Sequence, residues 1–243
     1  MERVHISSAF DEDLERIQSD LMRMGGIVEK MITDAARALE RRDADMAAEV
    51  IAADREVDRL EEAVDQEVVR VLALRQPQAR DLRTVIAVMR IAGNLERIGD
   101  YAKNIAKRTA PLFELPPVGT SAGSLRRMAG EVGAMLKDAL DSFLRADADL
   151  AESVRLRDED VDQMYNALFR EFLTHMMEDP RNISPCMHLL FIAKNLERIG
   201  DHVTNIAEQT VYMATGRLPG DERPKRDITP TEAIGPDDAK ADD

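Results

Sequence analysis

Apolar side chains recur along this 243-residue chain at alternating steps of three and four residues, the spacing that places them on one face of an α-helix. The runs are too long for strands and are separated by short polar or proline-containing segments. They predict six long helices, three in each half of the chain. The six runs cover residues 10–35, 46–71, 82–106, 125–139, 150–168 and 186–200.

The two halves of the chain repeat each other. Residues 94–100 and 195–201 are the same heptapeptide, Asn-Leu-Glu-Arg-Ile-Gly-Asp, at a spacing of 101 residues. Residues 43–45, Asp-Ala-Asp, recur as residues 147–149 at a spacing of 104. We therefore predict an all-α fold of tandem duplicated three-helix bundles related by a pseudo-two-fold repeat.

Breaks in composition set the predicted boundaries. Prolines and glycines interrupt the helical pattern between Pro111 and Gly123, so the first bundle is expected to span residues 1–112 and the second residues 113–216. Beyond Gly216 the chain has four prolines, clustered acids and few apolar residues. Such a segment cannot bury enough surface to offset its ordering entropy, so residues 217–243 are predicted to form a disordered tail.

Composition narrows the class of protein. Hydrophobic residues make up 44% of the chain and aromatic residues 4%, with no Trp, which is typical of packed helices. The net charge of −14 and the dispersed basic residues argue against nucleic acid as a partner. A single cysteine, Cys186, excludes an internal disulfide and is expected to be buried. Neither a signal peptide nor a transmembrane segment is evident, which indicates a soluble, cytoplasmic protein.

Acidic pairs stand out in the first half. Asp54 with Asp58, and Glu96 with Asp100, are each four residues apart, one turn from each other on a helix. The midpoints of the two pairs, residues 56 and 98, both lie 21 residues from Pro77, about 31 Å along a helix. Two antiparallel helices joined near Pro77 would therefore bring four carboxylates to one level.

The second half repeats this arrangement. Asp158 with Asp162 and Glu197 with Asp201 are again four residues apart. Their midpoints are equidistant from the Asp179-Pro180 step, where the connecting turn is expected. Four carboxylates that converge would repel one another and shift toward protonation unless cations neutralise them.

Metal binding is the chemistry that these pairs favour. Oxygen ligands suit Mg²⁺, Mn²⁺, Ca²⁺ or iron, whereas zinc normally takes more His or Cys. Gly99 and Gly200, inside the repeated heptapeptides, predict close helix approach or a bulky ligand, and Asn104 and Asn205 are candidates to orient a carboxylate. The alternative is that the acids form ordinary ion pairs on solvated faces. Its candidate partners are Arg55, Arg59, Arg97, Lys103 and Arg198.

With these motifs the chain resembles the PhoU family of phosphate-transport regulators, whose hallmark is a tandem three-helix bundle with repeated Glu/Asp-x-x-x-Asp motifs. The resemblance covers about residues 5–216. It includes the connector at residues 76–83 and the stretch at residues 195–208. The four motifs stand here as Asp54-x-x-x-Asp58, Glu96-x-x-x-Asp100, Asp158-x-x-x-Asp162 and Glu197-x-x-x-Asp201.

The resemblance implies a non-catalytic, cytoplasmic regulator of phosphate uptake and a negative regulator of the phosphate-starvation response. Its implied partners are the ATPase subunit of the phosphate ABC transporter, a phosphate-sensing histidine kinase and a second copy of the chain, with membranes reached only through those partners. The repeated motifs are expected to bind Fe, Mn, Mg or Zn. The alternative function is a carboxylate-bridged metalloenzyme, but neither copy has the Glu-x-x-His motif of such di-iron proteins.

Overall fold

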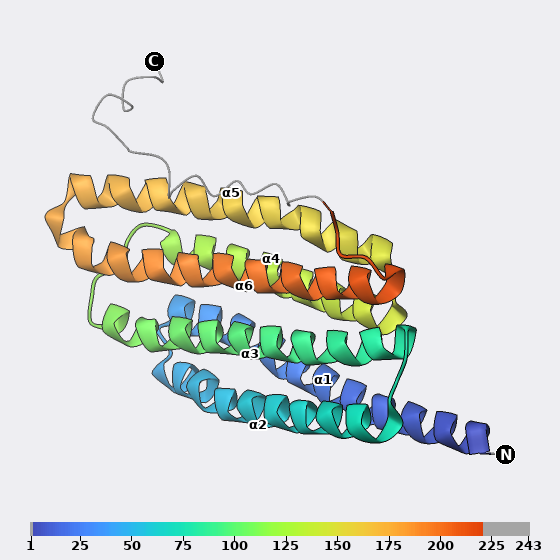
Figure 1. Ribbon diagram of the computed structural model, residues 1–243. Coiled ribbons are helices and arrows are strands. Elements are labelled where there is room, and N and C mark those ends of the chain that lie inside the picture. The colour runs from blue at the N-terminus through green and yellow to red at the C-terminus, as the bar shows by residue number, and fades with distance from the viewer. Residues whose placement is uncertain (1, 221–243) are drawn as a thin grey trace.

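The computed structural model describes residues 2–220, and six α-helices account for most of that range (Figure 1). The helices are α1 (Glu2–Arg41), α2 (Ala44–Arg75), α3 (Arg80–Phe113), α4 (Ser121–Arg145), α5 (Ala148–Glu178) and α6 (Ile183–Thr215). A short 3₁₀ turn, η1 (Pro180–Asn182), joins α5 to α6, and these residues contain no strand. The predicted all-α fold is confirmed. The predicted disordered tail lies, from residue 221 onward, outside the described residues.

Each half of the molecule is a bundle of three helices in mutual contact. α1, α2 and α3 pack against one another, and so do α4, α5 and α6. The halves meet where α3 contacts α6 and α1 contacts α4. Figure 1 shows α3 and α6 side by side, with the chain running in opposite directions along them. The duplication is therefore visible as two similar bundles joined through their first and third helices.

The repeated Asp-Ala-Asp segment caps the second helix of each bundle. The carboxylate of Asp43 accepts a hydrogen bond of 2.9 Å from the backbone N–H of Met46. Asp147 accepts one of 3.0 Å from Leu150 at the start of α5. An N-terminal cap of this kind is worth about 1 kcal/mol, so the repeat conserves a helix start.

The break between the bundles lies later than Pro111 alone would indicate. α3 continues through Pro111 to Phe113, and the connecting segment runs from residue 114 to residue 120. Pro111 has no N–H to bond the carbonyl four residues before it, and the helix ends two residues later.

The predicted apolar faces form the core, with one shift in register. Val57, Val85, Met135 and Cys186 on these faces are all fully buried. On α3, however, Leu82 and Met89 are exposed, whereas neighbouring residues such as Val88 and Ile91 are buried. Positions that repeat every seven residues move gradually around a helix of 3.6 residues per turn. Leu82 and Met89, the first and third positions of the predicted apolar face, have therefore rotated toward the edge of the core.

Apolar side chains are concentrated on inward-facing stripes rather than spread around each helix. Consistent with this, no helix in residues 2–220 is long and apolar enough to cross a membrane.

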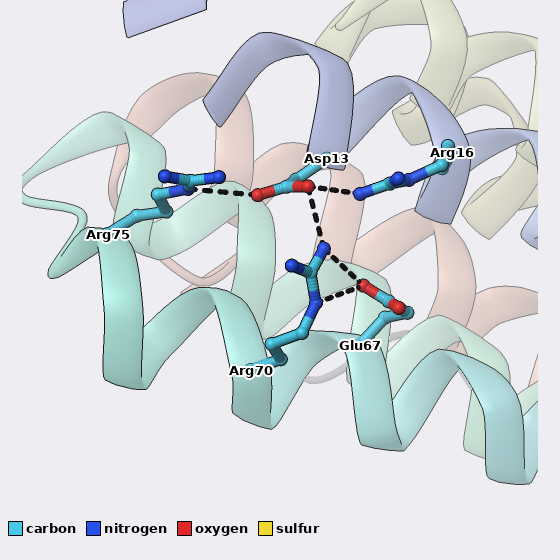
Figure 2. Close-up of polar contacts among 5 residues, drawn as sticks. All are labelled: Asp13, Arg16, Glu67, Arg70 and Arg75. Carbon is cyan, nitrogen blue, oxygen red and sulfur yellow. Dashed lines mark hydrogen bonds and ion pairs between the residues drawn. The ribbon is translucent and has the colours of Figure 1, made fainter. Parts of the chain in front are cut away.

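A buried carboxylate fastens α1 to the end of α2. Asp13 on α1 is only 3% exposed, and it accepts hydrogen bonds from Arg70 at 2.7 Å and Arg75 at 2.9 Å (Figure 2). Arg16 also contacts it, and Arg70 is held in turn by Glu67. Burial alone would raise the pKa of Asp13, but the hydrogen bonds from Arg70 and Arg75 outweigh burial and lower it.

Replacement of Asp13 by Asn is expected to lower the free energy of unfolding at pH 7 by about 1.5–3 kcal/mol, the usual worth of hydrogen bonds to a charged group. Because the folded-state pKa is lowered, the stabilisation is present above the unfolded pKa of about 3.9 and is lost as the pH falls through the folded value. Denaturant titrations across this pH range should therefore show the two proteins converging in acid. Asp11→Asn, an exposed acid on the same helix, is the control. Equal losses for both variants would contradict the prediction.

Candidate functional site

Lys103 joins the two acidic pairs of the first half. Its Nζ lies 2.5 Å from Oδ2 of Asp54 on α2 and 2.5 Å from Oδ1 of Asp100 on its own helix, α3. Asp54 is buried, and Lys103 and Asp100 are half-buried. The structure therefore brings α2 and α3 together at the level that the midpoint at Pro77 predicted.

The pKa values of the other two predicted acids, Asp58 and Glu96, respond to the same negative charge. Partial burial raises the pKa of Asp58, and the charges of Asp54 and Asp100 raise it further. Lys103 opposes this shift without cancelling it. Burial also raises the pKa of Glu96, followed by the charge of Asp100. All four predicted carboxylates of the first half thus belong to one cluster whose negative charge is only partly balanced.

A fifth acid, Glu61, belongs to this cluster and was missed by the sequence analysis. Burial raises its pKa, and the charges of Asp65 and Asp58 add to that effect. Glu61 in turn contributes to the raised pKa of Glu96 across the interface between α2 and α3. The signal was present in the sequence, because Asp54, Asp58, Glu61 and Asp65 follow one another at steps of four, three and four.

Ion pairs account for part of the charge in this cluster, as the alternative interpretation expected. Besides Lys103, Arg97 lies 3.5 Å from Glu96 and 3.8 Å from Asp100. Within residues 2–220, no three His, Cys, Asp or Glu side chains converge in the way that would hold a metal ion. The carboxylates interact electrostatically without converging on one point, and metal binding by Asp54, Asp58, Glu96 and Asp100 stays a prediction.

The corresponding acids of the second half are buried more deeply. Asp158, Asp162 and Glu197 are 2%, 4% and 6% exposed, and Asp201 is half-buried. The Oδ1 atom of Asp158 lies 3.0 Å from the position that a Cβ on Gly200 would occupy. Gly200 therefore permits the predicted close approach of α5 and α6, at the level where their acids were expected to meet.

The two acidic sites have diverged at their borders. Glu61 corresponds to Tyr165 in the second half, and Lys103 corresponds to Thr204, a buried residue whose hydroxyl bonds to the carbonyl of its own helix. One cation of the second site is Lys194, whose Nζ bonds to Glu197 at 2.9 Å and lies 4.9 Å from the ring of Tyr165. The first site is therefore more exposed and is bordered by the acid Glu61, whereas the second is buried and is bordered by the aromatic ring of Tyr165.

The contact between α3 and α6, here called the seam, uses other residues of the repeated motif. Asn94 on α3 bonds through Oδ1 to Nδ1 of His202 on α6 at 2.8 Å, and Asn205 donates to the same oxygen at 3.4 Å. Asn104 lines a groove between the same two helices. Asn104 and Asn205 were candidates to orient carboxylates, but the structure places both along the seam.

These features define a class of protein: a pair of fused three-helix bundles, each with acidic pairs contributed by two neighbouring helices. A family model described as "PhoU domain" matches residues 21–109 and again residues 125–210, one match in each bundle. The chain belongs to the PhoU family, and the resemblance found in its sequence is confirmed.

Curated relatives and solved structures agree with this assignment. The "Phosphate-specific transport system accessory protein PhoU homolog" of Rhizobium meliloti (strain 1021) is 47% identical over 231 residues, which are 95% of this chain and 98% of the relative. The protein of the same name from Caulobacter vibrioides (strain NA1000 / CB15N) is 46% identical over 92% of this chain and 97% of its own length.

The crystal structure of PhoU from Pseudomonas aeruginosa superposes with a TM-score of 0.82 at 43% identity and covers 86% of this chain and 100% of its own. The phosphate transport system regulatory protein PhoU from Streptococcus pneumoniae gives a TM-score of 0.79 at 33% identity, over 86% of this chain and 99% of its own.

The two glycines of the repeated heptapeptide should respond to alanine in opposite directions. A Cβ on Gly99 would lie 3.4 Å from Val57, an ordinary contact, so Gly99→Ala should stabilise the protein by up to about 1 kcal/mol through helix propensity. A Cβ on Gly200 would lie 3.0 Å from Asp158 and 3.3 Å from Val161, so Gly200→Ala should destabilise it. Each variant controls for the other in a denaturant titration. Changes of the same sign would show that the two sites do not differ in packing as described.

Proposed function

We propose that this protein is a regulatory accessory protein of a phosphate-specific transport system and that it acts by binding other proteins rather than by catalysis. The observation that carries the proposal is the presence of one PhoU domain in each bundle, together with 47% identity to a named accessory protein over 95% of the chain. Similarity of this extent leaves no large segment of either protein outside the comparison.

In its finer form the proposal makes the protein a cytoplasmic adaptor between the ATPase subunit of the transporter and a sensor histidine kinase, acting as a homodimer. Its role is to restrain the starvation response when phosphate is abundant. The outermost helices offer surfaces for such contacts, because α2 exposes Val69 and Leu74, and α5 exposes Leu156 and Met177. Apolar side chains exposed on long, regular helices are suited to docking against a partner.

Deletion of the gene should switch on phosphate-starvation genes in phosphate-rich medium, because the restraint on the kinase is lost. A starvation-gene reporter and the rate of phosphate uptake measure this effect, and the wild-type gene supplied in trans should reverse it. In phosphate-poor medium the deletion strain and its parent should give the same reporter level. An unchanged reporter and unchanged uptake in rich medium would exclude the proposed function.

We also propose that the acidic clusters bind divalent or iron-type cations as part of this function. Support comes from the first cluster, where burial and neighbouring carboxylates raise the pKa values of Asp58 and Glu96. A cation there would relieve repulsion that Lys103 leaves unbalanced. In the second half the proposed ligands are Asp158, Asp162, Glu197 and Asp201. Oxygen donors do not select one metal, so elemental analysis of protein purified without chelator or nickel resin is needed to identify it.

Lys103 competes with any such cation, since its ammonium group is bonded to both Asp54 and Asp100. Replacement of Lys103 by Met should therefore raise the affinity for Mn²⁺ by at least about tenfold, equivalent to about 1.4 kcal/mol, while Glu96→Gln should lower it. Isothermal titration calorimetry on chelator-treated protein measures both changes.

Arg59→Met is the matched control for the removal of Lys103, because Arg59 lies on the exposed surface of α2 and pairs with Glu56 instead. Its affinity for Mn²⁺ should stay within about twofold of wild type. If Lys103→Met and Arg59→Met bind Mn²⁺ equally, or if the wild-type protein binds none, the clusters are not metal sites.

A further inference from the structure

The seam between α3 and α6 has an internal symmetry that allows one end to be compared with the other. The two helices are antiparallel and carry the same heptapeptide, so each residue of α3 has a counterpart on α6 at a spacing of 101. Gly99 and Gly200 are counterparts near the middle of the seam. Contacts on one side of these glycines should therefore have equivalents on the other side.

On one side the seam is closed by direct hydrogen bonds. Arg90 donates to Oε1 of Gln209 at 3.1 Å, and Asn94 bonds with His202 at 2.8 Å. The rings of His202 and Tyr101 lie 5.6 Å apart near the centre. Polar groups on this side of the seam are thus satisfied by each other across the two helices.

On the other side the seam opens into a groove of about 480 Å³. The counterpart of the bonded pair Arg90 and Gln209 is Phe191 and Arg108, in which the guanidinium of Arg108 stacks 4.1 Å from the ring of Phe191 instead of bonding across the seam. Arg198 lies 5.7 Å from the ring of Tyr101 in the same way. Both guanidinium groups are oriented by aromatic rings.

The groove is lined by four cationic side chains, from Lys107 and Arg108 on α3 and from Lys194 and Arg198 on α6. Three of these positions differ in charge from their counterparts, because Lys107 corresponds to Glu208, Arg108 to Gln209 and Lys194 to Gly93. The fold does not require these charges, since the closed side of the seam is built without them. Lys194 also pairs with Glu197 in the second acidic site, so the charges that call for a role specific to the groove are those of Lys107 and Arg108.

Three of the four cations of the groove have no ion pair with a carboxylate in the described part of the chain. Lys194 is bonded to Glu197, but no carboxylate of residues 2–220 lies within ion-pair distance of Lys107, Arg108 or Arg198. Four cations gathered in one groove repel one another and are stabilised by a bound anion. This gathering of cations contrasts with the net charge of −14 on the whole chain.

We propose that this groove binds a small anion that carries two or more phosphate groups. Guanidinium and ammonium groups are the side chains that best recognise phosphate oxygens, and Asn104 and Asn195 add amide donors at the same place. A volume of about 480 Å³ lies within the range of small-molecule sites. Four cations, partly offset by Glu197, match the charge of a diphosphate or triphosphate better than that of a single phosphate. This ligand goes beyond the proposed function and does not depend on it.

The test replaces two residues of the groove with the residues found at the counterpart positions on the closed side of the seam. The double variant Lys107→Glu, Arg108→Gln carries the residues that the chain itself uses at the counterpart positions, Glu208 and Gln209. Calorimetric titration of the full chain with tripolyphosphate, in a metal-free buffer of moderate ionic strength, should show one binding event in the wild type. The affinity should fall at least about tenfold in the double variant.

Arg127→Gln is the control, because Arg127 is an exposed arginine on α4 that lies outside both the groove and the acidic clusters. This variant should bind tripolyphosphate within about twofold of wild type. Thermal melting of each variant establishes that a loss of binding is not a loss of fold.

Four outcomes would overturn the proposal. The first is absence of binding by the wild type at millimolar tripolyphosphate, and the second is equal binding by the wild type and the folded double variant. The third is binding of a poly-glutamate peptide but not of tripolyphosphate, which would make the groove a site for an acidic protein partner. Binding of orthophosphate as tight as that of tripolyphosphate would refute the requirement for two phosphate groups. None of these results bears on the gene-deletion test.

Discussion

The antiparallel contact between α3 and α6 is the constraint on which the other features depend. It brings two copies of one heptapeptide together, and a helix of 3.6 residues per turn divides the residues of that heptapeptide among different faces. Asn94 is directed to the other half of the molecule, where it bonds with His202. Asp100 is directed to its own bundle, where Lys103 connects it to Asp54 on α2. One short sequence thus both joins the halves and supplies each half with an acidic site.

Duplication has preserved the helix geometry while the electrostatics of the two acidic sites diverged. In the first half, Asp58 is largely exposed, and its remaining contact with the protein, together with the neighbouring acids, raises its pKa. In the second, Asp158 and Asp162 are almost completely buried, with Tyr165 in place of an acid. Water screens the charges of an open site and not those of a closed one, so the two sites differ in how much each depends on a compensating cation.

Local patterns were sufficient to predict the helices, their order and the level at which the acids meet. Helix rise and antiparallel packing alone place the acids of α2 and α3 at equal distances from Pro77, and the contact of Lys103 with Asp54 agrees with this prediction. The missing parts depend on contacts between helices that are distant in sequence. The bonds of Asp13 with Arg75 span 62 residues, and the groove at Arg108 requires α3 and α6 to be neighbours, which periodicity does not specify.

A duplicated fold also supplies its own comparison for assigning roles to residues. Side chains shared by counterpart positions, such as the fully buried Ile98 and Ile199, are explained by packing that both halves need. Side chains that differ at counterpart positions call for a local cause, because both positions lie on α-helices of the same repeat. The acids recur in both copies and so do not meet this criterion. Arg108 does meet it, because the counterpart position on the closed side of the seam carries a neutral glutamine. Differences between the halves therefore identify chemistry that the repeat alone does not require.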